Sequence, residues 1–163
     1  MRSVIRTSLK GERMPYVSFH DHFPEIAKRE TRTVTLLASS PFKLPPGQYA
    51  LLEMYCDEVG CDCRRVFFYV LSSHSKSPEA VVAYGWEPAA FYAKWAHDDD
   101  PEVVHQVKGP ILNLTSPQSE HAPEILRLIE EVVLQDSAYV ERLRAHYNLF
   151  RRQVDECKTR APS

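Results

Sequence analysis

The stretch that decides the fold is YCDEVGCDCRRV, residues 55–66, in which a short polar loop holding three cysteines joins two strand-like segments. The flanking segments, residues 48–55 and 64–71, are rich in β-branched and aromatic residues, which favour β-strands. A loop of this kind between two such segments predicts a β-hairpin. The hairpin would gather all three thiols at one end.

The thiols of Cys56, Cys61 and Cys63 are typical zinc ligands, because zinc prefers a tetrahedron of thiolate and imidazole donors. The loop itself lacks a fourth ligand of this kind. His20 and His22 are the expected source, because they share a short segment and lie outside any long apolar stripe. We therefore predict one zinc ion (Zn²⁺) per chain, held by the three cysteines and one of these two histidines.

Two other interpretations of the cysteines stay open at this stage. In a thiol-redox protein Cys61 and Cys63 would form a reversible pair, which requires an exposed thiol with a lowered pKa. In a zinc-dependent hydrolase-type enzyme one metal position would be open, with a nearby carboxylate such as Asp57 or Glu58 as the base. The hydrolase and deaminase signatures H-E-x-x-H and H-x-E with P-C-x-x-C are absent.

The fold expected around this hairpin is of the α+β class. Four strand-like segments, residues 31–38, 48–55, 64–71 and 80–86, predict an antiparallel sheet of about four strands. From residue 87 onward the apolar period becomes helical, which predicts a helical C-terminal half covering the sheet.

The expected helices have recognisable ends. Pro24 opens a short helix over residues 24–30, and Pro88 precedes a longer one. Asp100 is a suitable N-cap for a helix that stops at Gly109. Apolar stripes predict two more helices, over residues 123–135 and 138–156.

Length and composition predict one domain over residues 1–163, with residues 1–15 as a loose basic arm or edge strand and 158–163 as a polar tail. The formal net charge of −2 gives no general attraction to nucleic acid or to acidic membranes. The chain has no apolar stretch long enough for a membrane span or a secretion signal, and three of its four cysteines are clustered. We therefore expect a cytoplasmic protein.

The remaining motifs carry less information. Phosphate-binding patterns such as GxGxxG are absent, so no nucleotide cofactor is expected. His74 and His97 are reserve candidates for a metal position, whereas the other histidines are expected on the surface or in satisfied pairs. Cys157 lies near the end of the last expected helix and is predicted to lie outside the metal site.

Three longer stretches, YCDEVGCDCRRVFFYV, YGWEPAAFYAKW and KGPILNLTSPQSEHAPEILRLIEEVVLQDSAYVERLRAHYNLFR, are similar to a family of uncharacterised bacterial proteins. The resemblance covers roughly residues 16–155. Some relatives resemble this chain followed by a SEC-C zinc-knuckle tail with a C-x-C-G-S motif, which this sequence lacks. The resemblance implies a module with a metal site and implies no reaction.

Together these observations predict a zinc-binding protein with a structural metal site. We expect a non-catalytic module that binds another macromolecule, a protein rather than a nucleic acid, without membrane association.

Overall fold

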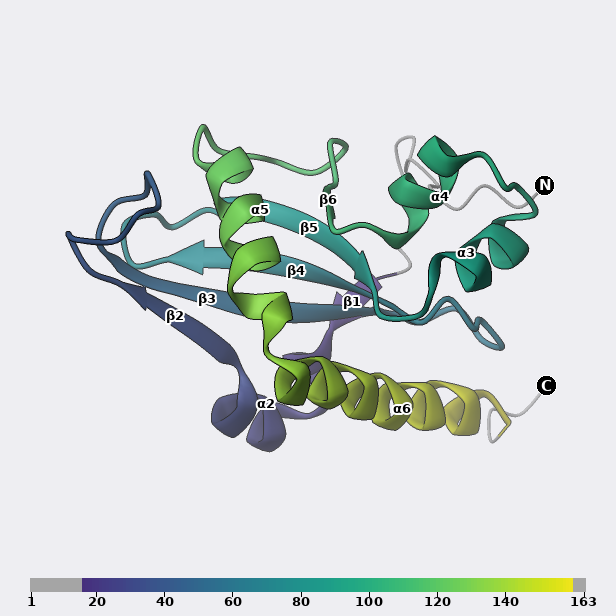
Figure 1. Ribbon diagram of the computed structural model, residues 1–163. Helices are drawn as coiled ribbons and strands as arrows, with labels where there is room; N and C mark the ends of the chain where they lie inside the picture. The colour runs from purple at the N-terminus through teal and green to yellow at the C-terminus, as the bar shows by residue number, and fades with distance from the viewer. Residues whose placement is uncertain (1–15, 160–163) are drawn as a thin grey trace.

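The structure is a computed structural model that describes residues 16–159, in which helices pack on one antiparallel sheet (Figure 1). The strands are β1 (Tyr16–Ser18), β2 (Arg32–Leu36), β3 (Gly47–Cys56), β4 (Arg65–Ser72), β5 (Ala80–Gly85) and β6 (Ile111–Leu112). The helices are α1 (Phe19–His22), α2 (Pro24–Glu30), α3 (Ala89–Ala96), α4 (Pro101–Lys108), α5 (Ala122–Glu131), the 3₁₀ turn η1 (Val133–Gln135) and α6 (Ser137–Thr159).

The α+β class, the antiparallel sheet and the helical C-terminal half are confirmed. Among the described residues the sheet has 6 strands rather than about four. The predicted segments correspond to β2, β3, β4 and β5, and the additional strands β1 and β6 are only 3 and 2 residues long. Segments this short show no alternation of apolar and polar residues, so their sequence does not distinguish them from loops.

The strand order is β1-β3-β4-β5-β6, and β2 also pairs with β3. Strands β1 and β2 share one edge of β3: Ser18 pairs with Met54, and Arg32 pairs with Leu51. They therefore form one interrupted edge, and helices α1 and α2 connect its two parts. This topology places Tyr16 opposite Cys56, at the end of the sheet that carries the thiols.

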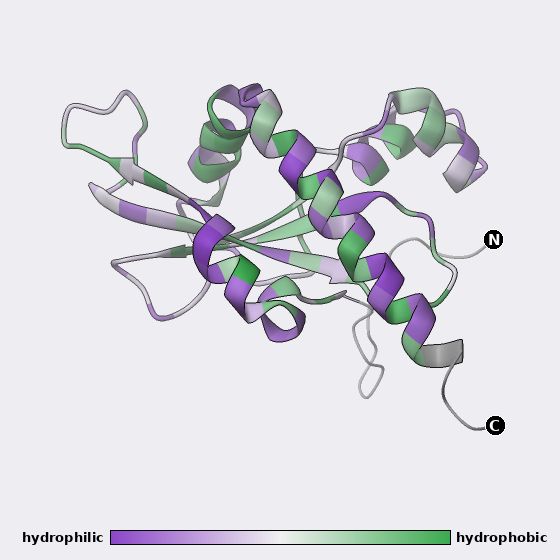
Figure 2. Ribbon diagram, turned by 90° about the horizontal axis from the view of Figure 1, so that it is seen from below, coloured by the Kyte–Doolittle hydropathy of each residue, from purple (hydrophilic) through white to green (hydrophobic). Residues whose placement is uncertain are grey.

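The main core lies between one face of the sheet and helices α5 and α6. Along β3 the buried side chains alternate, as expected for a strand with one covered face. Those buried residues pack with apolar residues of the two helices, including Ile125 of α5 and Leu143 and Phe150 of α6. Figure 2 shows the bands of hydrophobic and hydrophilic residues along these helices. Burial of this stripe stabilises α6 and fixes the side chains that it directs toward the thiol loop.

Two helix boundaries show how the local sequence and backbone determine where a helix begins or ends. The Asp100 side chain accepts a hydrogen bond from the backbone N–H of Glu102 at 2.8 Å, which confirms the predicted N-cap of α4. The predicted helix over residues 123–135 is divided at Val132, whose φ of −120° departs from helical geometry. Its second part is the 3₁₀ turn η1.

Helix α2 spans the predicted residues 24–30. Within residues 16–159 no helix combines the length and apolar character that a membrane span requires. The predicted arm at residues 1–15 and the end of the predicted tail, residues 160–163, lie outside the described part of the chain.

Candidate metal centre

The three thiols meet at one end of the sheet, as the hairpin prediction required. Cys56 is the last residue of β3, and Cys61 and Cys63 lie in the loop that leads into β4. Their Sγ atoms all lie within 4.8 Å of one another. Cys56 and Cys63 are buried, whereas Cys61 is half-buried. Three soft donors at this spacing can close on a single metal ion.

The loop bends so that backbone N–H groups face the sulfurs. The N–H of Glu58 points to the Sγ of Cys56 at 3.4 Å, and the N–H of Cys63 bonds to Cys61. Gly60, with φ of +70°, makes the turn between them. Hydrogen bonds of this kind favour the thiolate over the thiol, and the thiolate is the form that binds metals.

Helix α6 holds the loop from the side. The guanidinium of Arg151 donates hydrogen bonds to three loop carbonyls, at 2.8 Å to Cys56, 2.8 Å to Glu58 and 2.9 Å to Cys61. The carboxylate of Asp155 accepts from the N–H of Gly60 at 3.1 Å. Helix α6 thus binds the loop backbone at three carbonyls and one N–H group.

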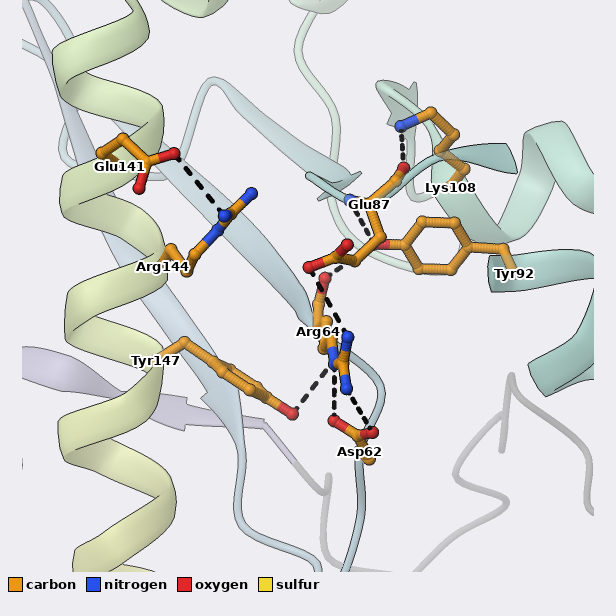
Figure 3. A network of polar contacts seen from close by, with 8 residues as sticks. All are labelled: Asp62, Arg64, Glu87, Tyr92, Lys108, Glu141, Arg144 and Tyr147. Atoms are coloured by element: carbon orange, nitrogen blue, oxygen red, sulfur yellow. Dashed lines mark hydrogen bonds and ion pairs between the residues drawn. The ribbon is translucent and has the colours of Figure 1, made fainter. Parts of the chain in front are cut away.

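The end of the loop is fixed by two tyrosines (Figure 3). The N–H of Arg64 donates to the hydroxyl of Tyr147 on α6 at 3.2 Å, and the hydroxyl of Tyr92 on α3 donates to the Arg64 carbonyl at 2.8 Å. The Arg64 side chain pairs with Asp62 at 2.8 Å. Asp62 is therefore engaged in an exposed ion pair with Arg64. The two tyrosine contacts fix the direction in which the loop enters β4.

The three thiols share protons unequally. Hydrogen bonds from Cys56 and then from Cys63 lower the pKa of Cys61 to about 3. The hydrogen bond to Cys61 raises the pKa of Cys56. For Cys63 the hydrogen bond with Cys56 acts downward, but the bond with Cys61 and burial raise the pKa to about 11. The cluster therefore holds one thiolate readily, and a bound cation would favour release of the remaining protons.

The structure does not bring His20 or His22 to the thiols. His22 points to α6, where its Nδ1 lies 2.8 Å from the Gln153 side chain and its ring packs against Phe150. His20 is exposed. Within the described residues the ligand group consists of the three cysteines alone.

The physical reason is the helical turn after β1. Pairing of β1 with β3 does bring the N-terminal segment to the site, but it places Tyr16 there. Helix α1 then buries Phe19 against Tyr55 and His146, and three residues later His22 contacts α6.

The reserve histidines lie elsewhere. His74 contacts the carbonyl of Pro46, and His97 ends α3 with a positive φ of 55°. Cys157 is an exposed free thiol on α6, outside the ligand group.

Sequence reasoning did not identify the arginines Arg65 and Arg151 as part of this centre. Arg65 follows Cys63 by two residues, so strand alternation could have placed it near the thiols, but an arginine in a strand is ordinarily assigned to the surface. Arg151 is separated from Cys56 by 95 residues, and no local pattern connects them.

A second polar centre lies where α6 meets β3 and α2, and it is formed by His146, Glu53 and Glu30. The Nδ1 of His146 lies 2.9 Å from a carboxylate oxygen of Glu53, and its Nε2 lies 2.6 Å from Glu30. Tyr55 donates to Glu53 at 2.9 Å. Both ring nitrogens of His146 are therefore partnered, in keeping with its expected role as a satisfied histidine.

Comparison with known proteins assigns neither a family nor a function to the chain. No protein-family model matches the chain, and neither a curated protein nor a solved structure is significantly similar to it.

Proposed function

We propose that this chain is a zinc-binding protein whose site is formed by Cys56, Cys61 and Cys63. The observation that carries the proposal is the approach of three Sγ atoms to within 4.8 Å of one another in a loop whose N–H groups face two of them. Zinc is the first choice among metals because thiolate ligands select soft or borderline ions, and Zn²⁺ is borderline-soft and has no redox chemistry.

The metal would have a structural role in this proposal. Arg151 and Asp155 hold the loop to α6, and the metal would hold its two ends to each other. Two of the three thiols are buried, which favours a stable ion over a freely exchanging one. Because the unfolded chain has no such site, the binding free energy would add to the free energy of folding.

The role of a macromolecule-binding module is also part of the proposal. The sheet face opposite the main core carries half-buried apolar side chains, namely Leu52, Met54, Phe67, Tyr69 and Leu71. Apolar and aromatic side chains of this kind suit a protein surface better than a nucleic acid. The resemblance to bacterial proteins of similar sequence is compatible with such a module.

One observation favours thiol-redox chemistry as the second candidate. Cys61 combines half-exposure with a pKa lowered to about 3 by its hydrogen bonds to Cys56, which are properties of reactive thiols. A hydrolase-type enzyme would use the position left open by the three cysteines. Metal analysis separates redox chemistry from both zinc hypotheses.

The test is elemental analysis of the reduced protein, purified without a metal-binding tag. We expect about one zinc per chain in the wild type and in Cys157→Ser, which removes an exposed thiol outside the site. Cys61→Ser should lose the zinc, whereas His20→Ala and His22→Ala should retain it. Absence of metal in the reduced wild type would exclude the proposal and favour the redox alternative.

A further inference from the structure

The outer edge of β2 is a row of backbone groups that no strand of the described chain covers. In Figure 1 β2 lies at the edge of the sheet, and among residues 16–159 its one strand partner is β3. The pairing runs without a bulge from Arg32, opposite Leu51, to Leu36, opposite Gly47. An open edge of this kind is a template for another strand, and native proteins usually protect it.

The hydrogen bonds of β3 show which residues of β2 face this edge. The N–H of Ser73 donates to the carbonyl of Gln48 at 3.0 Å, and the N–H of Gln48 donates to the Ser73 hydroxyl at 3.2 Å. Gln48 therefore turns its backbone toward β4. Because successive residues of a strand bond to opposite sides, the next residue of β3 bonds to its partner on β2, Val34. By the same alternation, the N–H and C=O groups of Thr33 and Thr35 point to the outer edge.

This edge lacks the features that usually prevent strand pairing. Residues 32–36 contain neither lysine nor proline, and Thr33 and Thr35 are exposed and uncharged. The charge of Arg32 is directed to the helices, where the guanidinium pairs with Asp136, just before α6, at 3.1 Å. The side chains along the edge therefore offer no charge that would repel a second strand.

The other side of the sheet shows how the chain protects an edge. There β6 covers only the end of β5, and the side-chain amide of Gln118 bonds to the residue before it. Its oxygen accepts from the N–H of Val81 at 3.0 Å, and its nitrogen donates to the Val81 carbonyl at 2.9 Å. Within the part of the chain that the structure describes, no side chain bonds to Thr33 or Thr35 in this way.

The edge is complementary to a second copy of itself. In an antiparallel pair centred on Val34, Thr33 lies opposite the partner's Thr35, and Thr35 lies opposite the partner's Thr33. Each pair joins outward-facing residues, which can exchange N–H to C=O hydrogen bonds. Opposed threonines are a favourable cross-strand pair, and Arg32 meets the partner's Leu36 rather than another charge. This register satisfies the edges of both chains without a like-charge contact.

We propose that two copies of this chain associate by antiparallel pairing of their β2 strands about a twofold axis at Val34. Such an axis is perpendicular to the sheet, so the two sheets become one and the helices of both chains lie on the same side. Thr33 and Thr35 share the open sheet face with Leu52 and Leu71, so the pairing joins the open faces of the two copies. The inference is independent of the proposed metal site, because the thiols lie at the opposite end of β3.

The oligomeric state of the full-length protein is the first measurement. Strand β2 has 5 residues, so the contact is small and we expect a weak, reversible dimer. Sedimentation velocity from about 1 μM to about 1 mM covers the corresponding dissociation constants. A reducing buffer prevents disulfide cross-linking through the exposed thiol of Cys157.

Charges placed at the two threonines test the register. The variants Thr33→Lys/Thr35→Lys and Thr33→Glu/Thr35→Glu bring like charges together in both pairs, and each should weaken the dimer about tenfold. An equimolar mixture of the two should associate again, because each lysine then meets a glutamate. Thr33→Lys/Thr35→Glu should dimerise like the wild type, because its two pairs are of opposite charge.

The matched control is Gln48→Lys. Gln48 is exposed on the same sheet face, and it pairs with Thr35 from the inner side, away from the edge. We expect no change in the dimer. Hydrogen exchange gives a second readout: the amides of Thr33 and Thr35 should exchange more slowly at high than at low protein concentration.

Four results would overturn the inference. The first is a wild type that stays monomeric up to about 1 mM. The second is an equal loss of dimer in Gln48→Lys and Thr33→Lys/Thr35→Lys, which would place the contact on the sheet face. The third is a monomeric Thr33→Lys/Thr35→Glu, and the fourth is a mixture of the like-charged variants that does not associate. The zinc content of the same samples tests the metal site separately, and either proposal can fail without the other.

Discussion

The two polar centres on α6 differ in how completely the chain satisfies them. In the Glu53–His146–Glu30 centre an imidazole lies between two carboxylates, and both of its nitrogens have partners. In the thiol centre three sulfurs share protons while buried donors of Arg65 and Arg151 lack acceptors. Buried polar groups in native proteins are normally paired.

The difference indicates which centre depends on something outside the chain. The histidine centre has its own counter-charges and explains the docking of α2 and β3 on α6. In the thiol centre Arg151 binds the loop carbonyls, and the three Sγ atoms form a group that could hold a metal ion. The first is complete within the chain, and for the second we propose a bound metal ion.

The largest expected effect follows removal of the metal. We predict that a competing chelator lowers the free energy of unfolding of the reduced protein by about 4 kcal/mol, relative to free zinc at a thousandfold excess over its Kd. Urea denaturation with and without chelator measures the difference. Cys61→Ser should not respond to the chelator, and equal stability of the loaded and chelated wild type would place the thiol centre in the same class as the histidine centre.

The next effect concerns the histidine centre. His146→Ala leaves the buried Glu53 with the Tyr55 hydroxyl but without the imidazole, and we predict a loss of about 3 kcal/mol in the free energy of unfolding. The value is at the low end for a broken buried pair because the Glu30 side chain is 40% exposed and can be hydrated. His105→Ala, at an exposed position of α4, is the matched control. Zinc content should not change in either variant, whereas loss of zinc in His146→Ala would show that the two centres are coupled.

A smaller effect is expected from pH. Burial lowers the pKa of His146, but the hydrogen bonds and charges of Glu53 and Glu30 outweigh it and raise the pKa above its usual value. The folded protein therefore holds this proton more tightly than the unfolded chain. The stability contributed by protonated His146 is fully present below the pKa of histidine in the unfolded chain, about 6.5. It is lost as the pH rises through the raised pKa of His146 in the folded protein.

Urea denaturation of the zinc-loaded protein across this range measures the effect. The comparison with His146→Ala removes this proton, while the titrating groups outside the centre are common to both proteins. Stability should fall with rising pH more steeply in the wild type than in the variant. Parallel profiles would mean that His146 has the same proton affinity in the folded and unfolded states.

The contrast also shows what the sequence could predict. The thiol cluster was predictable because its members lie within one hairpin loop, so local strand and turn patterns bring them together. The four longer strands and the amphipathic helices were predictable for the same reason, since period and capping are local. In these regions, closeness in the sequence nearly determines closeness in the structure.

The histidine centre was not predictable in this way. His146 meets Glu53 across 93 residues and Glu30 across 116, and Arg151 meets the loop across similar separations. Such contacts follow from the docking of α6 on the sheet. The same docking explains why the predicted histidine ligand is not found at the thiols: the sequence places His22 near β1, but the packing of Phe19 on His146 leaves His22 against α6.

The smallest expected effect tests whether the helix or the metal orders the thiol loop. Asp155→Ala removes the acceptor for the Gly60 N–H, at a cost of about 1 kcal/mol or less for an exposed bond. Hydrogen exchange of the Gly60 amide should become faster, and more so in chelated than in zinc-loaded protein, because the metal would hold the loop ends when the helix does not. Asp155→Asn keeps an acceptor oxygen and should exchange like the wild type. An equal acceleration with and without zinc would mean that α6 alone orders the loop, and the thiol centre would then resemble the histidine centre more closely than its unpaired donors indicate.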